Sequence, residues 1–292
     1  MDYTSDLKRG ERGAWLSIFA YIFLSILKLT VGIIGGSEAL RADGLNNSTD
    51  VIASVAVLIG LKIARKPPDE DHHYGHTRAE TIASLAAAFI MVTVGLQVLV
   101  DAGQSLYLNN NETPEILTAW VALFSSAVMF GVYRYNSLLA AKVNSNAIKA
   151  AAADNKSDAL VSIGAFVGII GARLGIGWLD SVTAFLVGII IIKTAWDIFR
   201  ESTHALTDGF EEAMLKKIED TIRTTKGVTS VRLIKGRMHG SKPLVDATVC
   251  VDPQITVYDG HKITEDIERR MKQEHNITYV HIHIEPESKD NK

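Results

Sequence analysis

Long runs of apolar residues fill the first two thirds of the chain. Six of these runs approach the roughly 20 residues that a helix needs to cross a lipid bilayer. They lie at residues 14–36, 38–64, 79–106, 115–135, 144–172 and 177–199. The pattern predicts an α-helical membrane protein with six transmembrane helices.

Beyond about residue 200, charged residues become frequent and the apolar positions follow shorter periods. These periods predict, in order, a helix at 210–225, strands at 228–235 and 244–251, a helix at 258–273 and a strand at 279–284. The order αββαβ is typical of a small two-layer α+β domain. We divide the chain into an N-terminal segment (1–13), a membrane domain (14–200), a linker or hinge (201–209) and a soluble αββαβ domain (210–292), for which the family resemblance given below implies a regulatory and dimerisation role.

The positive charges predict the orientation of the helices. An even number of spans puts both termini on one side of the membrane. Lys and Arg gather in the N-terminal segment and in the connections between the second and third and the fourth and fifth spans, whereas the opposite loops contain mainly Arg41 and Arg173. We therefore expect a multi-pass protein of the plasma or inner membrane with both termini and the tail in the cytoplasm.

Composition adds little about partners. The net charge of -3 does not indicate any particular partner. We expect the protein to contact the lipid bilayer and to bind no nucleic acid. The single cysteine, Cys250, excludes a disulfide framework and a multi-thiolate metal site within one chain.

Polar residues interrupt the second and fifth apolar runs. An ionised carboxylate at mid-bilayer costs about 2.5–3.5 kcal/mol on insertion scales, so such residues favour a functional role. Asn46 and Asp50, and likewise Asp154 and Asp158, are spaced i,i+4 and share one helix face. Asp50 and Asp158 each lie 14 residues from the cytoplasmic end of their span, about 21 Å at the rise of an α-helix. Two antiparallel helices would bring all four side chains to one level and form a metal site.

A structural role is the alternative for these acids. Lys28, Arg41 and Lys156 are possible counter-ions that would join the helices by salt bridges. Three acids on two aligned faces outnumber the nearby cations, however, and Lys156 lies two residues from each neighbouring Asp, which turns it to another face of its helix.

The residue types also select the ion. All four side chains offer oxygen, and a site without imidazole or thiolate favours Mn2+ over Zn2+. Four protein ligands suit Ca2+ and Mg2+ less well, because Ca2+ takes six to eight oxygens and Mg2+ retains its waters. Zn2+, Fe2+ and Co2+ remain alternative cargoes.

Over nearly its whole length the chain resembles the cation diffusion facilitators. The resemblance rests on the segments 43–50 and 69–80, on the Asp154 and Asp158 pair, and on the αββαβ tail. Zinc members typically have His or Asp at the position of Asn46 and His at that of Asp154, so this chain is more similar to the manganese-exporting branch. The resemblance implies a homodimer that exchanges cytoplasmic metal for protons by alternating access.

Asp69, His72 and His76, in the connection between the second and third spans, match positions that bind a second metal in some family members. Gly75 and two prolines argue against a regular helix there. A merely solvated, charged loop is an equal alternative.

The tail holds a third candidate metal site. Three residues match tail metal positions of the family: His261, His283 and Glu285. Arg232 and Thr248 stand where other members have histidines, and His239 and Asp246 are the candidate substitutes for them. The two-residue period of the last strand puts His283 and Glu285 on its outer face.

Arg78 and Asp208 match a family charge pair that joins the third span to the entrance of the tail and could serve as a hinge.

Two other classes of function compete with transport. Paired intramembrane Asp residues could form the dyad of an aspartyl protease, but the expected Gly-x-Gly-Asp motif is absent. A membrane-anchored metal sensor would leave the intramembrane acids without a role.

Overall fold

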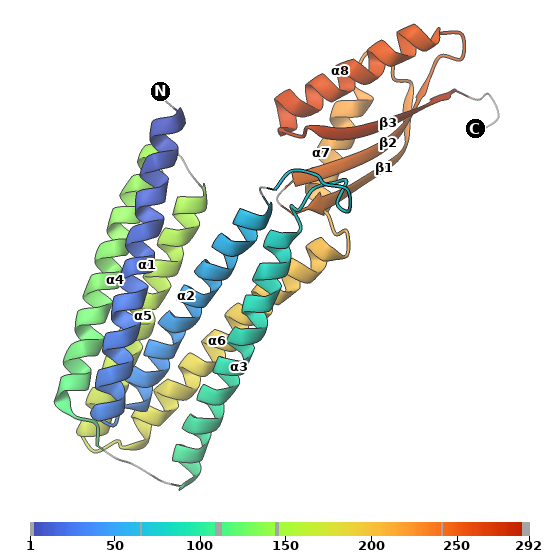
Figure 1. The fold of residues 1–292 in the computed structure, drawn as a ribbon. Helices are drawn as coiled ribbons and strands as arrows, with labels where there is room; N and C mark the ends of the chain where they lie inside the picture. Colours follow the sequence, from blue (N-terminus) through green and yellow to red (C-terminus); the bar gives the residue numbers. More distant parts are fainter. Residues whose placement is uncertain (1–2, 65, 109–112, 144–145, 241, 288–292) are drawn as a thin grey trace. The chain divides into compact units, whose positions relative to one another are not determined.

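The computed structural model describes the chain except for residues 1–2, 65, 109–112, 144–145, 241 and 288–292. The described part contains eight helices and three strands (Figure 1). It forms two compact units. One comprises Met1–Ala56 and Ala86–Ile198, and the other comprises Val57–Leu85 and Phe199–Lys292.

Six long helices confirm the predicted membrane domain. They are α1 (Tyr3–Ile34), α2 (Glu38–Ala64), α3 (Ala79–Leu108), α4 (Ile116–Val143), α5 (Asn146–Arg173) and α6 (Trp178–Leu206). Within the described residues, α1, α3, α4 and α6 contain stretches apolar enough to span a membrane by composition alone. The other two, α2 and α5, carry the four predicted metal ligands among other polar residues, and this content lowers their hydropathy.

The ends of three helices differ from the prediction. The sixth helix continues to Leu206 and not 199, and so takes in most of the predicted linker at 201–209. The first helix begins at Tyr3 and not near residue 14, because the preceding segment contains no proline that would end a helix. The fourth helix continues to Val143 and not 135, beyond its apolar stretch. Hydropathy marks the part of a helix that lies in lipid, and does not mark where the helix ends.

Small residues allow the membrane helices to approach closely. Ala119 and Ala122 of α4 and Ala165 of α5 are fully buried in one cluster. A side chain at Gly171 of α5 would collide with Leu179 of α6. Close packing through small residues is the usual way in which helices associate in lipid, where burial of apolar surface adds little.

The tail has the predicted αββαβ order. Its elements are α7 (Glu212–Arg223), β1 (Ser230–His239), β2 (Lys242–Val251), α8 (Val257–His275) and β3 (Tyr279–Pro286). The sheet order is β1-β2-β3. The pair β1 and β2 is antiparallel, whereas β2 and β3 are parallel and joined through α8.

Apolar residues on both tail helices and on the sheet share one core. Ile222 of α7, Val249 of β2 and Met271 of α8 are fully buried in it. On β3, Ile282 packs against this core while His281 is exposed, which confirms the predicted alternation.

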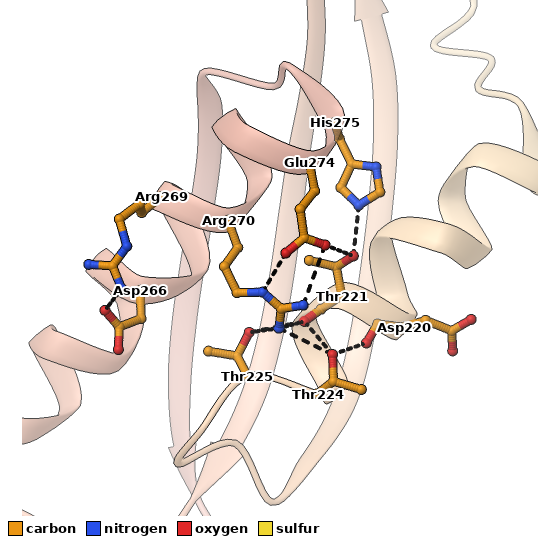
Figure 2. Close-up of polar contacts among 9 residues, drawn as sticks. All are labelled: Asp220, Thr221, Thr224, Thr225, Asp266, Arg269, Arg270, Glu274 and His275. Atoms are coloured by element: carbon orange, nitrogen blue, oxygen red, sulfur yellow. Dashed lines mark hydrogen bonds and ion pairs between the residues drawn. The ribbon is translucent and has the colours of Figure 1, made fainter.

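A polar network joins the end of α7 to α8 (Figure 2). The guanidinium of Arg270 donates through Nη1 to the Thr221 carbonyl oxygen at 2.7 Å and to the hydroxyls of Thr224 and Thr225. Its Nε donates to Glu274 at 2.7 Å. Arg270 therefore satisfies a carbonyl that the end of a helix leaves without an intrahelical partner.

Candidate metal centre

A layer of polar side chains lies inside the bundle between α1, α2 and α5. Asp158 is buried, with 7% of its surface exposed. Its Oδ1 accepts a hydrogen bond from Asn46 Nδ2 at 3.0 Å, and its Oδ2 accepts one from the Tyr21 hydroxyl at 2.7 Å. The Tyr21 hydroxyl also lies 3.0 Å from Asn155 Oδ1. The structure thus brings the predicted residues of α2 and α5 into direct contact.

The other two predicted ligands lie along the same helices. Asp50 is partly exposed, and its Oδ2 is a buried atom that accepts no hydrogen bond from the described residues. Asp154 is exposed. Asp50, Asp154 and Asp158 do not form a cluster with ligand atoms within 4.8 Å of one another, since the described part of the chain has one such group and it lies elsewhere. The oxygen donors and the free carboxylate oxygen of Asp50 fit a divalent cation as cargo.

One buried acid does join helices through an ion pair, but this acid is Asp43 and not one of the four predicted metal ligands. Lys28 lies 2.9 Å from Asp43, and both side chains are fully buried. Lys156 is exposed, and its ammonium lies 6.0 Å from the centre of the Tyr133 ring. Lys28 is therefore a counter-ion of Asp43.

The loop between α2 and α3 gathers its three predicted ligands without a helix. Asp69 Oδ1 accepts from the His72 backbone N–H at 2.8 Å and lies 3.0 Å from His72 Nδ1. His76 Nε2 lies 3.3 Å from Asp69 Oδ2. Candidate ligand atoms of the three residues all lie within 4.8 Å of one another, and no other such group occurs in the described residues. Desolvation raises the pKa of Asp69, but the hydrogen bonds and charge of His72 outweigh it and hold that pKa below its usual range.

The predicted tail ligands are spread over several elements. His283 lies 3.7 Å from Glu285, which also forms an ion pair with Arg232. His261 lies 3.5 Å from Glu265.

The proposed substitutes lie apart as well. Asp246 lies 4.0 Å from His281, and the His239 ring packs 5.9 Å from that of Tyr74. Burial, and then the positive charges of Arg78 and Arg237, lower the pKa of His239. Within the described residues of one chain, these tail side chains form no group of three metal ligands.

The predicted charge pair is formed. Arg78 Nη2 donates to Asp208 Oδ1 at 2.6 Å, with about a third of the Arg78 side chain and half of the Asp208 side chain exposed. Asp208 has a φ of 61°, in the left-handed region that follows many helix ends, and it comes two residues after the end of α6.

Sequence reasoning missed Tyr21 and Asn155, and it gave Lys28 only a general role as a counter-ion. A signal was present: Tyr21, Ser25 and Lys28 follow one another at i, i+4 and i+7 in an apolar run, which places them on one face of α1. A polar stripe on a membrane helix indicates a face turned toward the bundle interior.

A bundle of membrane-spanning helices with an anionic, oxygen-lined centre in its interior is the architecture of a cation transporter. Two family models match the chain. The cation efflux transmembrane domain matches residues 14–207, and the cytoplasmic domain of cation efflux proteins matches residues 210–287. The chain belongs to the cation efflux family, the cation diffusion facilitators, and is a divalent metal efflux transporter and not an enzyme.

Several relatives are similar over most of their length. The manganese efflux system protein MneS of Bacillus subtilis (strain 168) is 55% identical over 98% of this chain and 99% of its own. MneP, a manganese efflux system protein of the same organism, is 31% identical over 94% and 95%. The magnetosome protein MamM of Magnetospirillum gryphiswaldense is 32% identical over 87% and 81%. A solved copper form of the MamM CTD is 24% identical, covers 28% of this chain and 90% of that one, and has a TM-score of 0.26.

Proposed function

We propose that this protein exports Mn2+ from the cytoplasm in exchange for protons, by alternating access around a site formed by Asn46, Asp50, Asp154 and Asp158. The observation that carries the proposal is the hydrogen bond between Asn46 and Asp158. It joins α2 and α5 through two of the four predicted ligands, at a depth where polar groups need a functional reason.

Chemistry of the donors supports Mn2+ as the cargo. The four side chains offer oxygen ligands only. The imidazole nitrogen and thiolate sulfur that Zn2+ prefers are absent from this set. Two relatives named as manganese efflux proteins, one of them 55% identical, agree with this choice. Fe2+ and Co2+ are the nearest competitors by ligand chemistry.

Proton exchange follows from the crowding of carboxylates. Asp50, Asp154 and Asp158 lie along two adjacent helices, and like charges in a poorly solvated interior favour a bound proton over several ionised groups. A divalent cation replaces those protons because it neutralises the same oxygens. Metal and protons therefore compete for one site, which couples their movement in opposite directions.

The exposure of the Asp154 side chain supports entry of the ion beside this residue. Asp154 is exposed whereas Asp158, one turn further along α5, is buried. Asp154 lies toward the Asn146 end of α5, the end that the positive-inside pattern assigns to the cytoplasm. Both termini and the tail would then be cytoplasmic, and the tail would form the homodimer expected of a chain that matches the cytoplasmic domain of the family.

The Asp69, His72 and His76 loop would bind a second metal on the cytoplasmic side. Three ligand atoms from two imidazoles and one carboxylate form a borderline site that accepts Zn2+ as well as Mn2+. A tail metal site at His261, His283 and Glu285, with help from His239 or Asp246, would need movement of these side chains or ligands from a second copy of the chain.

Transport into liposomes tests the proposed function. Purified protein would be reconstituted and flux of Mn2+, Zn2+, Fe2+ and Co2+ measured with and without a proton gradient. Wild type should carry Mn2+ and respond to the gradient, and Asn46→His and Asp154→His should shift preference toward Zn2+. Transport of Zn2+ but not Mn2+ by wild type would refute the choice of ion. Unchanged flux in Asp50→Ala and Asp158→Ala would refute the site.

A further inference from the structure

Lys28 is a membrane-embedded cation with three polar partners. Its ammonium group lies 2.9 Å from Asp43 Oδ2 and donates to Asn47 Oδ1 at 2.7 Å and to Ser162 Oγ at 2.9 Å. Lys28, Asp43, Asn47 and Ser162 have no exposed surface. The ammonium therefore has two hydrogen-bond acceptors, and Asp43 is its ion-pair partner, although neither carboxylate oxygen of Asp43 accepts a hydrogen bond from the described residues. The acceptors come from α2 and α5, and Lys28 itself comes from α1.

This charged layer lies on one side of the candidate metal site along all three helices. On α1, Lys28 comes seven residues after Tyr21. On α2, Asp43 comes three residues before Asn46, and on α5, Ser162 comes four after Asp158. Because α2 runs antiparallel to α1 and α5, all three steps lead to the same end of the bundle, the end with the α1–α2 and α5–α6 turns. The positive-inside pattern assigns that end to the external side.

The two sides of the metal site therefore differ. On the Asn146 side of α5, the side chain of Asp154 is exposed. On the other side, a fully buried positive charge and its partners fill the interior between the three helices. A cation that moves outward from Asp158 meets Lys28 next, and in a medium of low dielectric their repulsion is large.

We propose that Lys28 and Asp43 form a charge gate that closes the external side of the metal site. Asp43 keeps the gate closed, since its Oδ2 forms the ion pair with the ammonium, while neither of its buried oxygens accepts a hydrogen bond from the described part of the chain. Outward release of the ion requires α1 to move relative to α2 and α5 so that Lys28 leaves the path. The free oxygen of Asp43 then faces the departing cation. Lys28 and Asp43 are positioning residues, because they control access and do not hold the ion in its bound state.

This inference rests on the proposed function, and a purely structural role gives a different expectation. If the buried ion pair only held three helices together, removal of either partner would destabilise the fold. Loss of Lys28 and loss of Asp43 would then both lower flux. A charge gate predicts opposite effects, because the cation is the barrier and the carboxylate is what holds and neutralises it.

Liposome flux of Mn2+, measured with and without a proton gradient, separates the two roles. Lys28→Gln keeps hydrogen-bonding groups but removes the charge, and should raise flux without the gradient about tenfold while loosening the ratio of protons to metal. Asp43→Asn leaves the cation without its counter-charge and should lower flux about tenfold under both conditions. Lys28→Arg keeps the charge and should retain coupling.

Equilibrium dialysis of 54Mn2+ on the same purified proteins checks that Lys28→Gln still binds the ion. Lys193→Gln, which removes an exposed lysine of α6, is the matched control. If Lys28→Gln does not fold, the double variant with Asp43→Asn, which leaves neither charge unpaired, takes its place with the same expectation. Parallel loss of flux in the Lys28 and Asp43 variants, or unchanged coupling in all of them, overturns the gate. A wild type that ignores the proton gradient would instead refute the proposed antiport.

Discussion

The side-chain amide of Asn46 donates to Asp158 Oδ1 across 3.0 Å, and this bond joins α2 to α5. An ionised carboxylate only accepts hydrogen bonds, so the NH2 group of Asn46 faces it and the carbonyl oxygen points away. A half turn of the amide would replace the donor with an oxygen ligand. A cation that binds Asp158 can therefore recruit Asn46 by a rotation of one side chain.

Asp158→Asn tests whether this carboxylate is a metal ligand. Loss of its charge should lower Mn2+ flux by more than the roughly 10–100-fold that loss of a group supporting a metal ligand costs. The measurement is liposome flux with equal amounts of folded protein. Asp101→Asn, which removes a carboxylate of α3 away from the site, is the control and should behave as wild type. Equal loss in both variants would show a general effect of removing membrane charges.

Tyr21→Phe should weaken Mn2+ binding about tenfold, because its hydroxyl orients Asp158 through a 2.7 Å hydrogen bond. The ring and its packing remain, so the fold should be unaffected. Isothermal titration of purified protein measures the affinity. Tyr133→Phe, on α4, removes a hydroxyl from another membrane tyrosine and should leave the affinity unchanged. Binding by Tyr21→Phe that equals wild type would contradict an orienting role.

The spacing of polar residues was enough to predict which faces of α2 and α5 meet, since Asn46 and Asp158 do make contact. Helical periodicity and an antiparallel arrangement fix the depth of a residue along its helix. They do not determine which third helix completes the layer. The contribution of Tyr21 from α1 depends on tertiary packing and on the rotation of that helix.

The loop and the tail show the same limit. The composition of the loop indicates metal ligands, but Gly75 adopts a φ of 79° and the backbone folds back on itself, which brings His76 toward Asp69. In the tail, the two-residue period predicted the outer face of β3. It could not predict that Arg232 of β1 would pair with Glu285, because the register of the strands decides that contact.

The loop cluster gives a prediction that is independent of transport. His76→Ala should remove one bound metal per chain, because it takes one of three ligands from the Asp69, His72 and His76 group. Metal content after equilibrium dialysis measures the loss. His73→Ala, an exposed histidine outside the group, should keep wild-type content. Since the pKa of Asp69 lies below its usual range, this carboxylate should stay ionised and remain a metal ligand on mild acidification.

Arg270→Ala should loosen the end of α7. The substitution removes donors to the Thr221 carbonyl and to two threonine hydroxyls, as Figure 2 shows, at a cost of about 1–3 kcal/mol in local stability. Hydrogen exchange of the α7 amides in the full-length protein measures the change. Arg269→Ala is the matched control, because its exposed contact is with Asp266 alone among the described residues and should contribute within about 1 kcal/mol.

The Arg270 contact also predicts a dependence on pH. The hydrogen bond from Arg270, ahead of an opposing desolvation, lowers the pKa of Glu274 from its ordinary 4.5. A carboxylate whose pKa is lower in the folded state stabilises that state above its unfolded pKa, and the effect disappears as the pH falls through the folded value. The difference in α7 exchange between wild type and Arg270→Ala should therefore be constant near neutral pH and shrink only below 4.5. A difference that already shrinks between pH 7 and 5 would contradict the assignment of the pH dependence to Glu274.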